Sequence, residues 1–304
     1  MQRRVAVVTG ASSGIGRAAA RRFAERGWDV VLAARRADAL ETVAEECLAA
    51  GVEAIAVPTD VAVEPEVQAL AHQALERFGR IDAWVNNAAV YLIAEFERTP
   101  PDAFRRVHDV NFFGVVHGCR AVLPHFRARG SGTIVNVASV DAYLGTHLAT
   151  AYASSKWAVR GFTDSLRQDL RGSGVRVSLV SPPAVDTPLF QHAANYTGRK
   201  LKAPNPTYDV STLAEAVVDA AESGRPEHVV GLVGKAIAAQ RKVMPRLVDA
   251  AFARQLGRDH FRDEAQPPTE GNLWQPVEAG TDASGGWGTT GGRLLATLRR
   301  RTPK

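Results

Sequence analysis

The sequence has few cysteines and lacks any long uninterrupted apolar run. Only Cys47 and Cys119 occur among 304 residues, which excludes a disulfide framework and a four-cysteine zinc site. Both fall in apolar helical patterns, where a cysteine is typically a small buried side chain. The longest apolar candidate, residues 229–239, is interrupted by Lys235. It is shorter than the roughly 18 residues of a membrane-spanning helix.

A strong excess of one charge is also missing. The chain carries 37 Lys and Arg against 32 Asp and Glu, a net charge of +5, with acids scattered among the bases. This pattern does not predict a nucleic-acid partner. The eight histidines form no ligand-spaced cluster, so we expect no metal site. Residues 1–4 leave no room for a signal-peptide core before a strand-like run, which favours a reducing, cytoplasmic location.

What the sequence does contain is a regular alternation of two periods. Short β-branched runs predict buried parallel strands, at residues 5–9, 30–34, 54–57, 83–86, 133–138, 175–180 and 229–233. Helical patterns lie between them, at residues 16–26, 38–50, 65–78, 101–129 and 151–171. The alternation predicts a single α/β domain over residues 1–257, with a doubly wound parallel sheet of about seven strands.

Two segments depart from this rhythm. Residues 184–209 are irregular and rich in proline, which is typical of a substrate-binding loop or lid. The Gly- and Pro-rich residues 258–304 predict an extended or partly disordered C-terminal tail. Its basic end, residues 293–304, is either solvated or attracted to an acidic partner or a membrane surface.

The first candidate site is a glycine-rich loop that follows the first strand and opens the first helix. It comprises Gly10, Ser12, Ser13, Gly14, Ile15 and Gly16. Glycines let the backbone approach a pyrophosphate closely, and a helix N-terminus offers unpaired N–H donors to it. The loop therefore predicts a bound dinucleotide.

The second candidate site pairs a tyrosine with a lysine. Tyr152 and Lys156 are four residues apart in a helical pattern and so share one face. An ammonium near a phenol stabilises the phenolate, which would make Tyr152 a general acid/base. Ser139, at the end of a strand 13 residues earlier, would hydrogen-bond the oxygen of the substrate.

Together these motifs resemble the short-chain dehydrogenase/reductase family, with a Rossmann-like fold. Further matching positions carry the resemblance, namely Asp60, Val61, Asn87, Ala88, Ala89, Asn111, Pro182, Val185 and Thr187. The resemblance implies that all of these except Asn111 contact the cofactor. It implies that Lys156 also holds the nicotinamide ribose and that Asn111 supports a water relay. It further implies a homodimer or homotetramer built on the helices that carry Asn111 and Tyr152.

The choice of cofactor depends on the end of the second strand. Arg35 and Arg36 stand where a carboxylate would select the free ribose of NAD(H). Guanidinium groups suit a 2′-phosphate, so we expect NADP(H), with NAD(H) left open. Two positions depart from the family pattern: Ala89 and Pro183 each replace a glycine. Neither belongs to the acid/base pair.

Candidate substrate contacts lie around the same strand ends. We expect Tyr143, Leu144, Leu189 and Phe190 to form apolar walls and His147 to touch the substrate. The resulting hypothesis is an NADP(H)-dependent oxidoreductase of a carbonyl/secondary alcohol pair with an apolar substrate. A non-enzymatic dinucleotide sensor or scaffold, and a membrane-surface reductase of lipidic substrates, remain alternatives.

Overall fold

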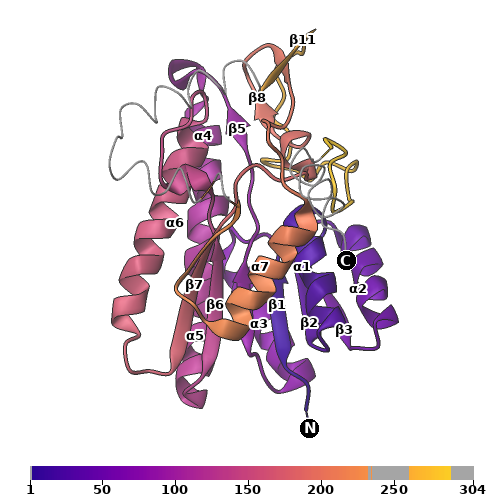
Figure 1. Cartoon of the computed structure of the whole chain (residues 1–304), viewed down its shortest axis with the longest axis vertical. Coiled ribbons are helices and arrows are strands. Elements are labelled where there is room, and N and C mark those ends of the chain that lie inside the picture. The colour runs from indigo at the N-terminus through magenta and orange to yellow at the C-terminus, as the bar shows by residue number, and fades with distance from the viewer. Residues whose placement is uncertain (1, 232–233, 235–259, 289–304) are drawn as a thin grey trace, which may run out of the picture.

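Seven parallel strands form the central sheet of the computed structural model, which describes residues 2–231, 234 and 260–288 (Figure 1). Their order is β10-β7-β6-β4-β1-β2-β3. The strands are β1 (Val5–Thr9), β2 (Asp29–Ala34), β3 (Ala54–Pro58), β4 (Ala83–Asn86), β6 (Gly132–Val137), β7 (Val175–Ser181) and β10 (Glu227–Val229).

The chain winds in opposite directions from the middle of this sheet. It passes from β1 to β2 and β3 on one side, then returns to β4 and continues to β6, β7 and β10 on the other. The carboxyl ends of β1 and β4 therefore lie side by side at the point where the winding reverses. In open parallel sheets this reversal leaves a crevice above the strand ends, where ligands bind.

Helices cover both faces of the sheet and bury two separate apolar cores (Figure 1). One face carries α1 (Gly14–Glu25), α2 (Ala37–Ala49) and α7 (Val210–Ser223). The other carries α3 (Glu64–Phe78), α4 (Pro101–His108), α5 (Gly114–Arg129) and α6 (Thr150–Asp169). Strand β1 is buried along its whole length, as the β-branched pattern predicts for a strand covered on both faces. The predicted fold class is confirmed.

Two predicted elements differ from the structure. The single helix expected over 101–129 is interrupted by the π-helical turn Asp109–Phe113, which joins α4 to α5. The strand expected at 229–233 is wrong in its bounds, because β10 spans Glu227–Val229 and ends where the prediction begins. Residues 232–233 lie outside the described part of the chain.

The described C-terminal residues 260–288 pack against the carboxyl edge of the sheet and are not the free tail that composition suggests (Figure 1). β11 (Phe261–Ala265) pairs antiparallel with β9 (Arg199–Leu201). β8 (Ala194–Asn195) pairs with β5 (Leu92–Ile93). The irregular segment 184–209 is thus held by strands on two sides.

The basic end at 293–304 lies outside the described residues. Its attraction to an acidic partner or a membrane surface therefore stays a prediction. Within the described residues, no helix combines the length and the apolarity needed to cross a bilayer. The proposed domain boundary at residue 257 falls in another undescribed stretch, residues 235–259, and stays a prediction.

Close contact between α1 and the end of β1 fixes the mouth of the crevice. A Cβ atom built on Gly16 would lie 2.1 Å from the Gly10 carbonyl oxygen and 2.6 Å from Asn87 Nδ2. Both neighbours are held in place, since Asn87 Nδ2 donates to the Thr9 carbonyl at 2.9 Å. Gly16 therefore sets how closely the helix approaches the sheet, the role of a third glycine in such loops.

We expect Gly16→Ala to lower the free energy of unfolding by about 2 kcal/mol, the usual cost of overpacking against fixed neighbours. Gly161→Ala, in α6, is the matched control because a Cβ there meets nothing within 4 Å. It should raise stability by ~0.5–1 kcal/mol through helix propensity. Urea unfolding of both variants measures the difference. Equal effects would contradict the tight contact.

Candidate active site

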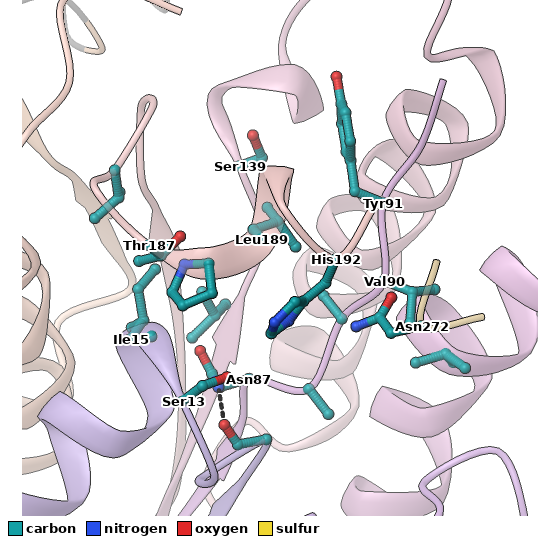
Figure 2. Close-up of a pocket in the computed structure, with 18 of the residues that line it drawn as sticks. Ser13, Ile15, Asn87, Val90, Tyr91, Ser139, Thr187, Leu189, His192 and Asn272 are labelled. Atoms are coloured by element: carbon teal, nitrogen blue, oxygen red, sulfur yellow. Dashed lines mark hydrogen bonds between the residues drawn. The ribbon is translucent and has the colours of Figure 1, made fainter. Parts of the chain in front are cut away.

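One elongated cavity lies above the carboxyl ends of the strands, and most of the predicted site residues line it (Figure 2). Arg35 and Arg36 line one end of it, while Ser139, Tyr152 and Lys156 line the other. The glycine-rich loop lies between them, since its residues from Gly10 to Ile15 contribute to the wall. A ligand in this cavity would therefore span both predicted sites.

Two glycines with left-handed backbone conformations, and hydrogen bonds to the end of β4, determine the shape of the glycine loop. Gly10 has φ +67° and Gly14 has φ +56°, conformations that other residues adopt only with strain. The Thr9 hydroxyl accepts hydrogen bonds from the Asn87 and Ala88 amides at 3.0 and 3.2 Å. Asn87 Nδ2 also approaches the Gly10 carbonyl at 3.4 Å (Figure 2). The loop is thus held rigidly with the first turn of α1 facing the cavity.

Three guanidinium groups and one carboxylate form a charged cluster at the β2 end. Arg106 bonds Asp60 with an N–O distance of 2.5 Å. Burial lowers the pKa of Arg35, the nearby charge of Asp60 raises it, and the charges of Arg106 and Arg36 lower it further. Because the positive charges outnumber the single carboxylate, this end of the cavity is suited to an anion.

The opposite end places three polar side chains on β6 and α6. Ser139 follows β6, and its hydroxyl accepts a hydrogen bond from the Asp141 amide at 3.1 Å. Lys156 is buried, and its Nζ donates to the Val137 carbonyl at 3.1 Å. The same Nζ lies 5.5 Å from the centre of the Tyr152 ring, so the predicted face of α6 does bring the tyrosine and lysine together.

The protonation equilibria of this end depend on a third charged group, Asp141. Burial raises the pKa of Tyr152 and the negative charge of Asp141 raises it further, with Ser139 acting in the opposite direction. Burial lowers the pKa of Lys156 to about 8, partly offset by Asp141. In this structure burial and a carboxylate favour the neutral phenol, and the phenolate stabilisation expected from Lys156 stays a prediction.

Asn111 lies in the π-helical turn and is fully buried. Its Oδ1 accepts from the Val90 amide at 2.8 Å, and its Nδ2 donates to the Val90 carbonyl at 3.0 Å and the Ser155 hydroxyl at 3.1 Å. The side chain thus joins the turn to α6 and to the segment after β4. Its predicted part in a water relay stays a prediction.

The profile of the short chain dehydrogenase family matches residues 4–197. The chain belongs to this family. The matched span includes β1, the glycine loop, Ser139, Tyr152 and Lys156, while residues 260–288 lie beyond it.

Relatives and solved structures agree with this assignment. YxnA of Bacillus subtilis, an uncharacterized oxidoreductase, is 37% identical over 270 residues, covering 88% of this chain and 76% of that protein. A short chain dehydrogenase/reductase from Burkholderia phymatum, solved with NAD, has a TM-score of 0.73 at 31% identity, covering 81% of this chain and 95% of that one. A metagenomic short-chain oxidoreductase, solved with NADP, has a TM-score of 0.65 at 31% identity, covering 76% and 97%. These similarities support a nicotinamide dinucleotide as the cofactor and leave the choice between NAD and NADP open.

The residues of this short chain dehydrogenase fit such a dinucleotide. The cavity wall includes the arginines Arg35 and Arg36, the glycine loop and the polar side chains of Ser139, Tyr152 and Lys156, an arrangement suited to an extended dinucleotide. Every predicted cofactor residue lines it except Gly16, whose part is the helix–sheet contact described above. Ala89 has no positive φ, so its replacement of glycine introduces no left-handed strain.

Three predicted substrate residues, Tyr143, Leu144 and His147, do not line this cavity, and their contact with a substrate stays a prediction. The Tyr143 hydroxyl turns away from the cavity to Glu227 and Ser181, at 2.5 and 3.2 Å. Leu144 is fully buried outside the cavity, and His147 is exposed. The cause is local: the chain turns at the 3₁₀ helix Val140–Ala142 directly after Ser139. Leu189 and Phe190 do line the cavity, as predicted.

Other lining residues were not found from the sequence. Among those with polar side chains are Tyr91, Asp141, Thr146, His192, His260 and Asn272. Asp141 carried a usable signal, because an acid two residues after a strand-end serine must lie near that serine. It accepts a hydrogen bond from the Thr146 hydroxyl at 2.7 Å. His260 and Asn272 belong to the C-terminal segment, which carries no motif that places it over the site.

We expect Asp141→Asn to shift the pH dependence of alcohol oxidation toward lower pH. Removing a negative charge beside Tyr152 lowers the pKa of the phenol, so the phenolate forms at lower pH. The measurement is kcat/KM for oxidation against pH. Asp169→Asn is the control, because Asp169 is exposed about 25 Å along α6 from Tyr152, beyond the range of screened charge. An unmoved profile in Asp141→Asn would contradict the coupling.

Proposed function

We propose that this short chain dehydrogenase is an NADP(H)-dependent oxidoreductase. It transfers a hydride between the nicotinamide and the carbonyl or secondary alcohol of an apolar substrate. The observation that carries the proposal is the joint lining of one cavity by the glycine loop, Arg35, Ser139, Tyr152 and Lys156. A non-enzymatic sensor would need the dinucleotide loop but not the acid/base end.

The protein's own groups handle the proton and the substrate oxygen. Tyr152 donates a proton to the oxygen in reduction and accepts it in oxidation. Its raised pKa favours the protonated phenol, which is the form needed for carbonyl reduction. Ser139 holds the same oxygen by a hydrogen bond. Lys156, buried beside the tyrosine ring, provides positive charge and ribose contacts. A bound nicotinamide supplies or accepts the hydride.

The preference for NADP(H) rests on the charged cluster. Arg35 and Arg36 follow the carboxyl end of β2 and line that end of the cavity. The strand ends in Ala34, so it provides no carboxylate beside them. Asp60, the acid nearest in the cluster, is engaged by Arg106 at 2.5 Å. A 2′-phosphate would supply the anion that these guanidinium groups lack.

The substrate end is largely aromatic and aliphatic. The Tyr91 ring lies edge-on to Tyr152 with centroids 4.8 Å apart, and Phe190 packs on Tyr91 at 5.6 Å. Leu189 adds a further apolar wall. Burial raises the pKa of Tyr91 well above its ordinary value, so this side chain remains neutral. An apolar carbonyl compound or alcohol suits such walls.

A homodimer or homotetramer is proposed for the assembled enzyme. Phe113, in the π-helical turn, and Trp157, on α6, are 46% and 43% exposed. Large apolar side chains on neighbouring helices favour contact with a second copy. The cytoplasmic location expected from the sequence stays a prediction.

We expect Tyr152→Phe to lower the rate of NADPH-dependent carbonyl reduction by about 10³-fold while NADPH still binds, since only the proton donor is lost. Tyr196→Phe is the matched control: Tyr196 is half-buried and does not line the cavity. Single-turnover kinetics and calorimetric NADPH titration give the two readouts. Equal measurable rates in wild type and Tyr152→Phe would contradict the role given to Tyr152, whereas NADPH binding without reduction in the wild type would favour the non-enzymatic alternative.

Cofactor titration tests the second part of the proposal. NADPH should bind more tightly than NADH, and Arg35→Ala should weaken NADPH binding by about 10–100-fold, the effect of one charge-assisted contact. NADH binding should change little. Arg127→Ala, an exposed arginine of α5, is the control. Equal or tighter NADH binding by the wild type would overturn the NADP(H) preference.

A further inference from the structure

Residues 269–287, here called the strap, lie across the dinucleotide end of the cavity. The strap starts beside β8, where Thr269 and Asn195 exchange backbone hydrogen bonds of 2.8 and 3.0 Å. It then reaches the β2 arginines and the start of α1, and it ends beside Asp186. Asn272, Pro276 and Val277 of the strap line the cavity itself, and Figure 2 shows Asn272 on the same cavity as His192 and Asn87.

The strap's backbone carbonyls occupy donors of the arginines proposed to bind the 2′-phosphate. Arg35 donates to the carbonyls of Asn272, Leu273 and Trp274 at 2.5, 3.2 and 3.1 Å. Arg36 donates to the carbonyls of residues 277, 278 and 279 at 2.6, 3.4 and 3.4 Å. Each guanidinium has only five N–H donors in a fixed plane. Both terminal nitrogens of Arg35 and Nη1 of Arg36 are therefore engaged by neutral oxygens.

The start of α1 is engaged in the same manner. The Gly14 amide donates to the Asp282 carbonyl at 3.0 Å, and Arg17 Nη1 donates to the Thr281 carbonyl at 2.8 Å. An N–H at a helix N-terminus is a preferred partner for phosphate oxygens. The strap thus presents carbonyl oxygens to several groups that favour phosphate.

Other contacts fasten the strap independently of the arginines. Asp186 accepts from the Ser284 hydroxyl at 2.8 Å and from the amides of Gly285 and Trp287 at 3.1 and 2.9 Å. Trp287 Nε1 donates to the Thr187 carbonyl at 3.0 Å. Leu273 is fully buried. Hydrogen bonds therefore hold the segment over the cavity at both ends.

We infer that the strap is a specificity-determining element that competes with the 2′-phosphate of NADP(H) for Arg35 and Arg36. This inference rests on the proposed function. The strap makes the preference for NADP(H) over NAD(H) smaller than the arginines alone would give.

The competition follows from which ligand needs the arginines. NAD(H) carries a free 2′-hydroxyl and leaves the guanidinium–carbonyl contacts in place. NADP(H) brings a phosphate, whose charge-assisted hydrogen bonds are about twice as strong as those of a neutral carbonyl. It therefore displaces the strap from residue 272 onward, and the contacts of its end with Asp186 and Thr187 are lost as well. The free energy of breaking the strap contacts is subtracted from NADP(H) binding only.

A variant that loosens the strap at a distance from the cavity tests whether the strap weakens NADP⁺ binding more than NAD⁺ binding. The double variant Ser284→Ala/Trp287→Phe removes side-chain donors to Asp186 and Thr187, and neither residue lines the main cavity. Thr281→Ala is the matched control, since Thr281 engages Arg17 through its backbone carbonyl. Calorimetry on the full-length chain gives the Kd of NADP⁺ and of NAD⁺ for each variant.

The ratio of NAD⁺ to NADP⁺ dissociation constants should rise at least about fivefold in the double variant, the effect of one hydrogen bond lost from the competing state. It should stay at the wild-type value in Thr281→Ala. An unchanged or lower ratio in the double variant would overturn the inference.

Hydrogen exchange of the wild type gives an independent readout. NADP⁺ should speed exchange of the amides in residues 272–279, whereas NAD⁺ should leave it unchanged or slow it. Equal protection by both dinucleotides would overturn the inference alone, because both still bind. Failure of NADP⁺ to bind would instead reject the proposed function, and the inference with it.

Discussion

The close approach of α1 to the end of β1 is the constraint on which the rest of the site depends. Gly16 admits no Cβ beside the Gly10 carbonyl, and Thr9 and Asn87 tie the ends of β1 and β4 together. The winding of the chain reverses between these two strands. The hydrogen bonds that join their ends therefore fix the position of the strand ends below the cavity. The arginine cluster and the catalytic end are then positioned on either side by strands paired to β1 and β4.

The electrostatics of the two ends are arranged in opposite senses. The dinucleotide end gathers Arg35, Arg36 and Arg106 around one carboxylate, leaving an excess of positive charge. The opposite end places Asp141 beside Tyr152 and Lys156 in a buried setting, which opposes ionisation of the phenol. A single cavity therefore offers an anion-binding end and an end that retains its proton.

The sequence predicted what local pattern controls and missed what long-range packing controls. Strand periodicity located the sheet, and the spacing of Tyr152 and Lys156 placed both on one helix face. Tyr143, Leu144 and His147 do not line the cavity because a short turn after Ser139 redirects the chain, and no periodic pattern reports such a turn. Asn272 and His260 were missed because their position depends on pairing between β11 and β9, elements about 60 residues apart in the sequence.

The π-helical turn between α4 and α5 has a consequence for how this region tolerates change. Each residue of an α-helix advances the side-chain direction by about 100°, and a π-helical turn accommodates one extra residue within the helix. Asn111 meets Val90 and Ser155 from within this turn, while α5 still buries Cys119, Val122 and Phe126 in the same core. Deleting one residue here would turn one of these two faces outward. Insertions and deletions in Asp109–Phe113 are thus constrained by helical phase, whereas single side-chain replacements on the exposed face of α5 are not.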